Sequence, residues 1–142
     1  MEPWLQTNFS EGQAVFSPDG RWVAYRSSES GRDEIYVQGY PERRGKWLIS
    51  SASGSFPQWS RDGRELFFAN LDGTLMAAEV KPGQAGIELG KVEALFRMPQ
   101  SLPFQSFQPS SDGKRFLLME PAEADRELPM VVIQNWPARL GN

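Results

Sequence analysis

Three aspartates of this sequence recur in the same short phrase, and their side chains could do chemistry. Asp19, Asp62 and Asp112 each follow a serine by two residues and precede a glycine, and they lie 43 and 50 residues apart. Repeated carboxylates can bind calcium, and a pair in unlike environments can act as general acid and base. The same phrase also fits a tight turn, in which the carboxylate accepts backbone N–H groups and glycine takes a positive φ. Because each phrase precedes an apolar stretch, we interpret it as a turn. The turn residues are Asp19, Gly20, Asp62, Gly63, Asp112 and Gly113.

The composition excludes most familiar catalytic and metal chemistry. The chain has no histidine and no cysteine, so Ser-His-Asp and Cys-His machinery and thiolate or imidazole metal sites are excluded. A hydrolase that uses only carboxylates needs two acids in different environments, and Glu11 is the obvious candidate for one of them. The net charge of −3 provides no basic footprint for nucleic acid, and no apolar run reaches the length of a membrane helix. We therefore expect no cofactor, no metal, no nucleic-acid partner, no membrane association and no enzymatic activity.

The segments around the three phrases are typical of β-strands. Apolar and aromatic residues stand in short runs bounded by Gly, Pro, Ser, Asn and Asp, and helical periodicity is hard to find. A period of about 40–50 residues built on a turn is typical of propeller blades, which are four-stranded sheets. The predicted strands are 13–17, 21–27, 34–40 and 46–50 in the first repeat, 56–60, 64–70, 74–81 and 88–96 in the second, and 105–108, 114–120 and 129–136 in the third.

The third repeat lacks an outermost strand, whereas the N-terminal segment carries a spare one. Trp4-Leu5-Gln6-Thr7 precedes the first inner strand and resembles Trp47-Leu48-Ile49-Ser50, which precedes the second. In closed propellers a terminal strand often completes the last blade, so that no sheet edge stays open. We therefore predict a closing strand in residues 1–12 and three blades at 13–52, 53–100 and 101–142. The fold class is all-β: a propeller fragment of three four-stranded antiparallel blades, the third completed by the N-terminal strand.

The repeats resemble the TolB-type, WD-repeat-like bacterial β-propellers. The resemblance rests on the blade signature, in which an aromatic residue and Ser-Pro-Asp-Gly-Lys/Arg precede a strand, as in residues 16–25. More narrowly, residues 3–136 are similar to the C-terminal three blades of large propeller proteins, some of which are fused to a serine/threonine kinase. The family implies protein or ligand binding and no single reaction. The third copy departs from the signature at Pro109-Ser110-Ser111, and the sequence contains no kinase loop, so kinase activity is not implied.

The starts of the inner strands are the best positions for a ligand site. Propeller ligands commonly dock where loops from several blades converge on the central channel, and the side chains here suit a peptide, a protein segment or a small polar ligand. The candidates are Glu11, Gln13, Phe56, Gln58, Gln105 and Phe107. Strand tryptophans such as Trp22 and Trp59 could stack on sugars or bases, but we interpret them as core between blades.

Three blades are too few to close a ring, because known propellers have about 4 to 8. The leading hypothesis is a non-enzymatic binding scaffold, half of a six-bladed ring, that forms a homodimer by strand exchange. The residues expected at this closure are Trp4, Leu5, Gln6, Val131, Val132 and Ile133. The alternative is a regulatory or sensor domain of a longer enzyme, such as a bacterial serine/threonine kinase or a peptidase. The chain as given is expected to be soluble and cytoplasmic, or periplasmic where an export signal has been removed.

Overall fold

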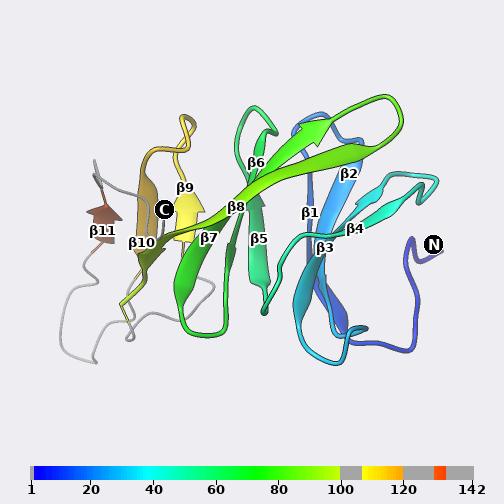
Figure 1. The fold of residues 1–142 in the computed structure, drawn as a ribbon, viewed down its shortest axis with the longest axis horizontal. Helices are drawn as coiled ribbons and strands as arrows, with labels where there is room; N and C mark the ends of the chain where they lie inside the picture. Colours follow the sequence, from blue (N-terminus) through cyan, green and yellow to red (C-terminus); the bar gives the residue numbers. More distant parts are fainter. Residues whose placement is uncertain (1, 100–106, 120–129, 134–142) are drawn as a thin grey trace.

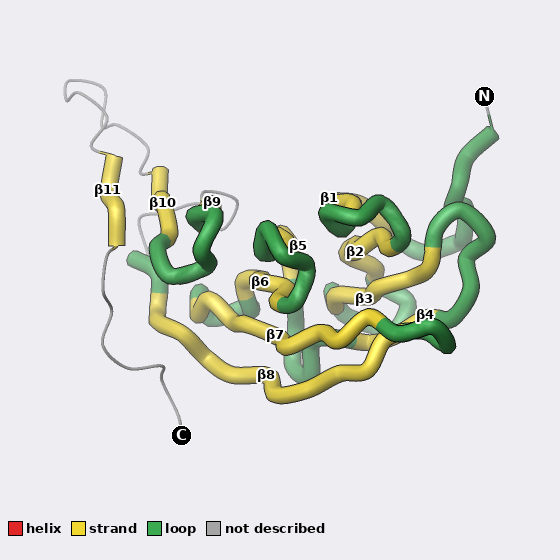
Figure 2. The backbone as a smooth tube through the Cα atoms, turned by 90° about the horizontal axis from the view of Figure 1, so that it is seen from above, coloured by secondary structure: helices red, strands yellow, loops and turns green. Residues whose placement is uncertain are grey.

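The computed structural model describes residues 2–99, 107–119 and 130–133, and the elements of this part of the chain are all β-strands. The strands form three separate antiparallel sheets that follow one another along the chain (Figure 1). Seen from above, the sheets stand side by side in an arc, with the first strand of each on the concave side (Figure 2). None of the described segments is a helix long and apolar enough to span a bilayer.

The first two sheets each have four strands in chain order, as predicted from the sequence. The first contains β1 (Glu11–Phe16), β2 (Trp22–Ser27), β3 (Glu34–Gly39) and β4 (Lys46–Leu48). The second contains β5 (Ser55–Trp59), β6 (Glu65–Ala69), β7 (Thr74–Pro82) and β8 (Ile87–Arg97). In the third, the described strands are β9 (Phe107–Pro109), β10 (Phe116–Met119) and β11 (Met130–Ile133), in the order β11-β10-β9.

The observed strands differ from the predicted ones mainly at their ends. β4 is shorter than predicted, although the Ile49 N–H still donates to the Ile35 carbonyl (2.8 Å) beyond its end. β8 begins and ends one residue outside its predicted range. The predicted positions 105, 106, 120, 129 and 134–136 lie outside the described residues. Residues 4–7, predicted to join the sheet of a second chain, form no strand within the single chain.

The Ser-x-Asp-Gly phrases form the turns between the first and second strands of the three sheets. In the second sheet, the Ser60 hydroxyl donates to Asp62 Oδ1 (2.8 Å) and accepts the Glu65 N–H (2.9 Å). Asp62 Oδ1 also accepts the Arg64 N–H (3.0 Å). Gly63 takes a φ of 71° and donates its N–H to the Ser60 carbonyl (3.0 Å). The same hydrogen bonds recur in the first and third turns, so one local structure is built three times.

These hydrogen bonds favour the charged form of the turn carboxylates. In Asp62, the N–H of Arg64 and then the Ser60 hydroxyl lower the pKa, and they outweigh the effect of burial. Burial is the largest influence on Asp19 and raises its pKa, but the hydrogen bonds of the turn together lower it. The pKa of Asp112 is lowered most by the serine hydroxyl of its own turn. The carboxylates thus hold the turns together as anions.

Apolar side chains fill the spaces between neighbouring sheets, where their burial stabilises the stack. Between the first and second sheets lie Trp22, Ala24, Ile35, Val37 and Ile49 from one side and Leu66, Phe68, Ala78, Val80 and Ile87 from the other. Between the second and third lie Phe67, Ala69, Leu75, Ala77, Leu95 and Met98 from one side and Phe107, Phe116 and Leu118 from the other.

Replacement of Asp62 by alanine should lower the free energy of unfolding by about 1–2 kcal/mol near neutral pH, because two donors lose their acceptor. The folded-state pKa of Asp62 lies below the ordinary value of 3.8. This stabilisation is therefore present above that value and is lost as the pH falls through the folded-state pKa. Urea unfolding at about pH 7 and about pH 3 should show the difference between wild type and D62A shrinking at the lower pH. E42A, at an exposed loop carboxylate, is the control; an equal difference at both pH values would contradict this account.

Candidate functional site

Four of the six predicted ligand-binding residues belong to β1 and β5, the strands on the concave side of the arc (Figure 2). Glu11 and Gln13 lie on β1, Phe56 and Gln58 lie on β5, and all four are half-buried. The Gln13 side chain connects the two sheets, because its Oε1 accepts the N–H of Phe56 (2.7 Å). The structure therefore brings Gln13 and the backbone of Phe56 together at a junction between sheets, while the Phe56 ring packs against the apolar cluster between the second and third sheets.

The other two predicted residues do not join this group. Phe107 is 5% exposed and belongs to the apolar cluster between the second and third sheets. Its register partner on β10 is Leu118, which is fully buried in the same cluster. The expectation of a channel-facing Phe107 is therefore corrected: this side chain is core. Gln105 lies outside the described residues.

Gln13 and Phe56 share an unusual backbone conformation that sequence reasoning missed. Their φ angles are 56° and 55°, and each lies at a β-bulge, where the pairing of the inner strand with its neighbour shifts register. A positive φ is uncommon for residues other than glycine, and a bulge changes the direction of nearby side chains. The two residues are 43 residues apart, like the first two turn aspartates. The bulge is therefore part of the repeat, and the spacing is the signal that could have revealed it.

The face of the first sheet that points away from the second sheet carries large apolar side chains. The residues of this open face are Phe16, Val23, Tyr25, Tyr36, Tyr40 and Leu48. Phe16 is 56% exposed, Leu48 47% and Tyr40 40%, and the rings of Phe16 and Tyr40 meet edge to face with centroids 4.9 Å apart. Within the described part of the chain no other sheet packs on this face, but Trp4 and Leu5 of the N-terminal segment do, and Val23, Tyr25 and Tyr36 are buried beneath them. The exposed side chains of Phe16, Tyr40 and Leu48 mark the part of this face that is available for an interaction.

The open face is equivalent to the faces that are buried elsewhere in the arc. Val23 and Tyr25 precede Leu66 and Phe68 by 43 residues, and both pairs occupy the same places on the second strand of their sheets. Leu66 and Phe68 pack against the preceding sheet and are fully buried. The open face therefore has the chemistry of a surface that receives a preceding sheet. This equivalence is visible in the sequence as the 43-residue spacing.

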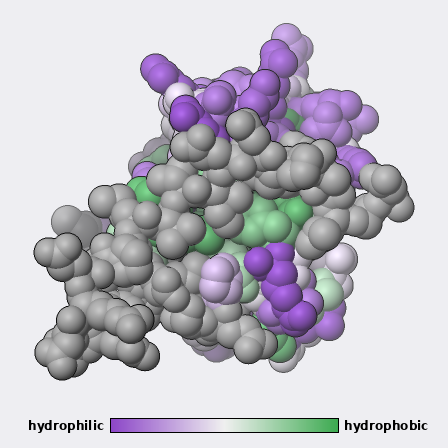
Figure 3. Space-filling model, turned by 90° about the vertical axis from the view of Figure 1, so that its left-hand side faces the viewer, coloured by the Kyte–Doolittle hydropathy of each residue, from purple (hydrophilic) through white to green (hydrophobic). Residues whose placement is uncertain are grey.

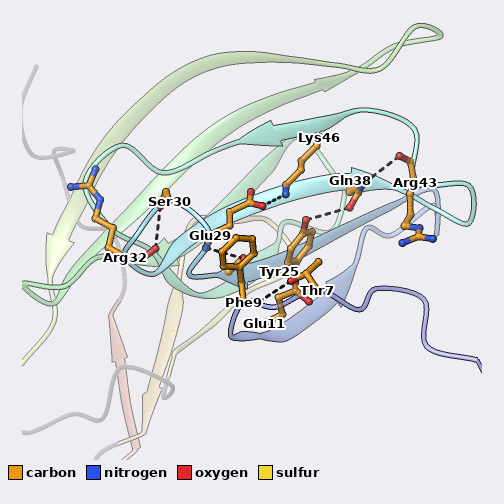
Figure 4. Close-up of polar contacts among 11 residues, drawn as sticks. Thr7, Phe9, Glu11, Tyr25, Glu29, Ser30, Arg32, Gln38, Arg43 and Lys46 are labelled. Carbon is orange, nitrogen blue, oxygen red and sulfur yellow. Dashed lines mark hydrogen bonds and ion pairs between the residues drawn. The ribbon is translucent and has the colours of Figure 1, made fainter.

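Polar contacts border the open face (Figure 4). The Tyr25 hydroxyl donates to Gln38 Oε1 (3.2 Å), and Gln38 Nε2 donates to the Arg43 carbonyl (3.2 Å). Lys46 forms an ion pair with Glu29 across the same region. Burial, and next the nearby carboxylate of Glu29, raises the pKa of Tyr25 well above that of a free tyrosine. The Tyr25 hydroxyl therefore stays protonated and remains a hydrogen-bond donor.

The opposite end of the arc also carries apolar residues. On the side of β10 that faces away from the second sheet, Leu117 is half-buried and Met119 is 57% exposed. β11 is the outer described strand of this sheet, and its Val132 and Met130 are the register partners of Leu117 and Met119. Figure 3, which views this end of the molecule, shows apolar side chains gathered there. The predicted closure residues Val131, Val132 and Ile133 all lie on β11.

An acidic hollow on the second sheet is a weaker candidate. It has a volume of about 360 Å³, and Glu65 and Glu79, which line it, are direct cross-strand partners. The basic side chains of Arg64 and Lys91 also line the hollow, and Lys91 forms an ion pair with Glu93 (2.7 Å). Among the described residues there is no group of three or more Asp, Glu, His or Cys side chains arranged to hold a metal ion. The open face of the first sheet therefore remains the better candidate.

Similarity to solved structures identifies the architecture. The chain is similar to oligogalacturonate lyase from Vibrio parahaemolyticus, with a TM-score of 0.63 and 15% identity over 82% of this chain and 31% of that chain. It is also similar to the β-propeller domain of Cps50 (Swd1) from Myceliophteria thermophila, with a TM-score of 0.58 and 15% identity over 89% of this chain and 44% of that chain. The fold is that of a β-propeller. The three sheets are blades one to three.

The comparisons confirm the predicted resemblance at the level of the fold. This chain spans less than half the length of each of these two structures, so it is a fragment of the architecture. At 15% identity these likenesses say nothing about activity or ligand. No protein-family model and no curated protein sequence matches the chain.

Replacement of Gln13 by alanine should lower the free energy of unfolding by about 1 kcal/mol, because the half-buried N–H of Phe56 loses its acceptor. Hydrogen exchange at the Phe56 amide should also become faster, since this hydrogen bond protects it. Urea unfolding and amide exchange measured by NMR test the two effects. Q84A, in the exposed loop between β7 and β8, provides the matched control. Unchanged exchange at Phe56 in Q13A would contradict the role assigned to this side chain.

Proposed function

We propose that this chain is a non-enzymatic binding scaffold, a half-propeller that two copies complete into a six-bladed ring. The observation that carries the proposal is the open face of blade one. Its Val23 and Tyr25 match Leu66 and Phe68, which blade two buries against blade one. The side chains of this face are of the kind that packs against a preceding blade. Blade three of a second copy of the chain could take that place.

A two-fold ring would place blade three of one copy against the open face of blade one of the other. The contact would bring Leu117 and Met119 toward Phe16 and Leu48, all of them now at least partly exposed. Burial of such side chains contributes about 1.5–3 kcal/mol each when it is complete. Two identical junctions form at once in a closed ring, so their contributions add within one association step.

Strand exchange would complete the same junction. The described part of blade three has three strands and ends at β11. Residues 4–7 of the other copy could pair with β11 as a fourth strand, which would satisfy backbone groups at that edge.

The binding role is proposed for the concave side of the completed ring. Glu11, Gln13 and Gln58 would project from inner strands around a common axis, with Phe56 beside them. Carboxylate, amide and aromatic groups suit a peptide or another small polar ligand. The absence of histidine and cysteine from the sequence favours binding over nucleophilic catalysis.

The mass in solution tests the proposal directly. The chain has a mass of 16.0 kDa, and light scattering on a size-exclusion column should report twice that value. A particle that stays at the mass of one chain at all concentrations would overturn the two-copy ring. That result would favour the alternative in which the missing blades belong to a longer polypeptide, such as a regulated enzyme.

A charged residue on the open face should break the ring without unfolding the blades. L48D places a carboxylate on that face, where Leu48 is 47% exposed, and burying it between blades would be costly. The dissociation constant of the dimer should rise about tenfold or more, while the circular dichroism spectrum stays unchanged. L71D is the matched control, because Leu71 is 82% exposed in the turn before β7. Equal dimerisation of L48D and L71D would rule out blade one's open face as the interface.

A further inference from the structure

Two tryptophans occupy equivalent places before successive blades. Trp4 and Trp47 are 43 residues apart, the same distance that separates the first two turns. Each is followed by leucine and precedes an inner strand, β1 for Trp4 and β5 for Trp47. Trp47 lies on β4, the outer strand of blade one. By this equivalence, Trp4 stands where the outer strand of a blade before blade one would carry its tryptophan.

Trp47 reaches forward from its own blade to the next one. Its ring meets Trp22 of blade one edge to face, with centroids 5.5 Å apart. The ring also lies against Gly86, in the loop between β7 and β8 of blade two, where an added Cβ would lie 2.5 Å from Trp47 Cζ2. The loop between the third and fourth strands of blade two therefore receives the tryptophan of the blade before it.

Trp4 makes the corresponding forward contact on blade one. Its indole N–H donates to the carbonyl of Pro41 (3.0 Å), and its ring centroid lies 5.8 Å from that of Tyr40. Both residues belong to the loop between β3 and β4, the third and fourth strands of blade one. Trp4 also meets the ring of Tyr25 on the open face at 6.4 Å. The same type of loop thus receives a tryptophan in both blades, although the blade that should carry Trp4 is missing from the described structure.

We infer that Trp4 is an anchor that holds residues 4–7 in the position of the outer strand of the absent blade, ready to pair with β11 of a second copy. This inference rests on the proposed two-copy ring and adds how its junction forms. The anchoring contacts lie on blade one's open face and its β3–β4 loop, so the segment is not part of a sheet of its own chain. Gln6 and Thr7, beyond the anchor, are exposed, and the hydrogen bonds of Thr7 to Glu11 and from the Phe9 N–H are made by its hydroxyl. Exchange therefore requires no blade to open, in contrast to a swap that removes a strand from a finished sheet.

Replacement of the Trp4 side chain by alanine tests this inference. W4A should weaken the dimer by about tenfold or more in Kd, as expected for an aromatic anchor at an interface, and should leave a cooperative urea transition in the monomer. F9A is the matched control, because Phe9 is an exposed aromatic residue of the same segment, five positions on. Sedimentation equilibrium measures both constants. Equal dimerisation of W4A and F9A would overturn the anchor.

Cross-linking tests the pairing itself, and the absence of cysteine from the chain makes it clean. A mixture of the Gln6→Cys and Val132→Cys variants, treated with a short bifunctional maleimide, should yield a covalent heterodimer. Gln84→Cys in place of Gln6→Cys is the control and should yield none. A dimer that forms by mass but gives no such cross-link would overturn the inference and leave the two-copy ring intact. A wild-type chain that stays monomeric would overturn the ring and the inference with it.

Discussion

Blade one and blade two each carry apolar side chains on both faces, and the rest of the structure depends on this constraint. In blade one, Trp22 and Ala24 face blade two, while Val23 and Tyr25 face the other way. In blade two, Leu66 and Phe68 face blade one, while Phe67 and Ala69 face blade three. A sheet of this type needs a neighbour on each side, because an uncovered apolar face keeps its contact with water. At the first end of the arc Trp4 and Leu5 cover Val23 and Tyr25, whereas Phe16 and Leu48 stay exposed until a neighbour covers them.

The repeated turn ensures that the apolar residues of the second strand face the correct neighbouring blade. Each turn joins the inner strand to the second strand with the same hydrogen bonds, so the second strand always enters the sheet in the same register. A shift of one residue would send every side chain of that strand to the opposite face. The three aspartates therefore do more than make turns: they determine which apolar residues face the preceding blade. This explains why Val23, Leu66 and Phe116 occupy equivalent positions.

The periodic phrase was sufficient to predict the sheets, their strand order and the turns. Strand alternation and the spacing of the aspartates are local signals, and they identified four strands in each of the first two repeats. The bulges at Gln13 and Phe56 were not predicted, because neither glutamine nor phenylalanine is a residue type that indicates a positive φ. Phe107 was expected at the channel because it lies at the start of the third inner strand, but its side chain packs in the cluster between blades two and three, as does that of its register partner Leu118. An aromatic strand residue gives no indication of whether a neighbour covers it, so the sequence predicted an incomplete ring without identifying the side chains of its uncovered faces.

The outer hairpin of blade two gives the chain an uneven mechanical strength. β7 and β8 have nine and eleven residues, against six and three in β3 and β4. The hairpin extends past its own blade to blade one, where Gly86 leaves room for the ring of Trp47. Blades one and two thus contact each other through their outer strands as well as through their packed faces. In any larger ring built from this chain, an applied force should therefore separate other pairs of neighbouring blades first. Blades one and two should stay together as one unit.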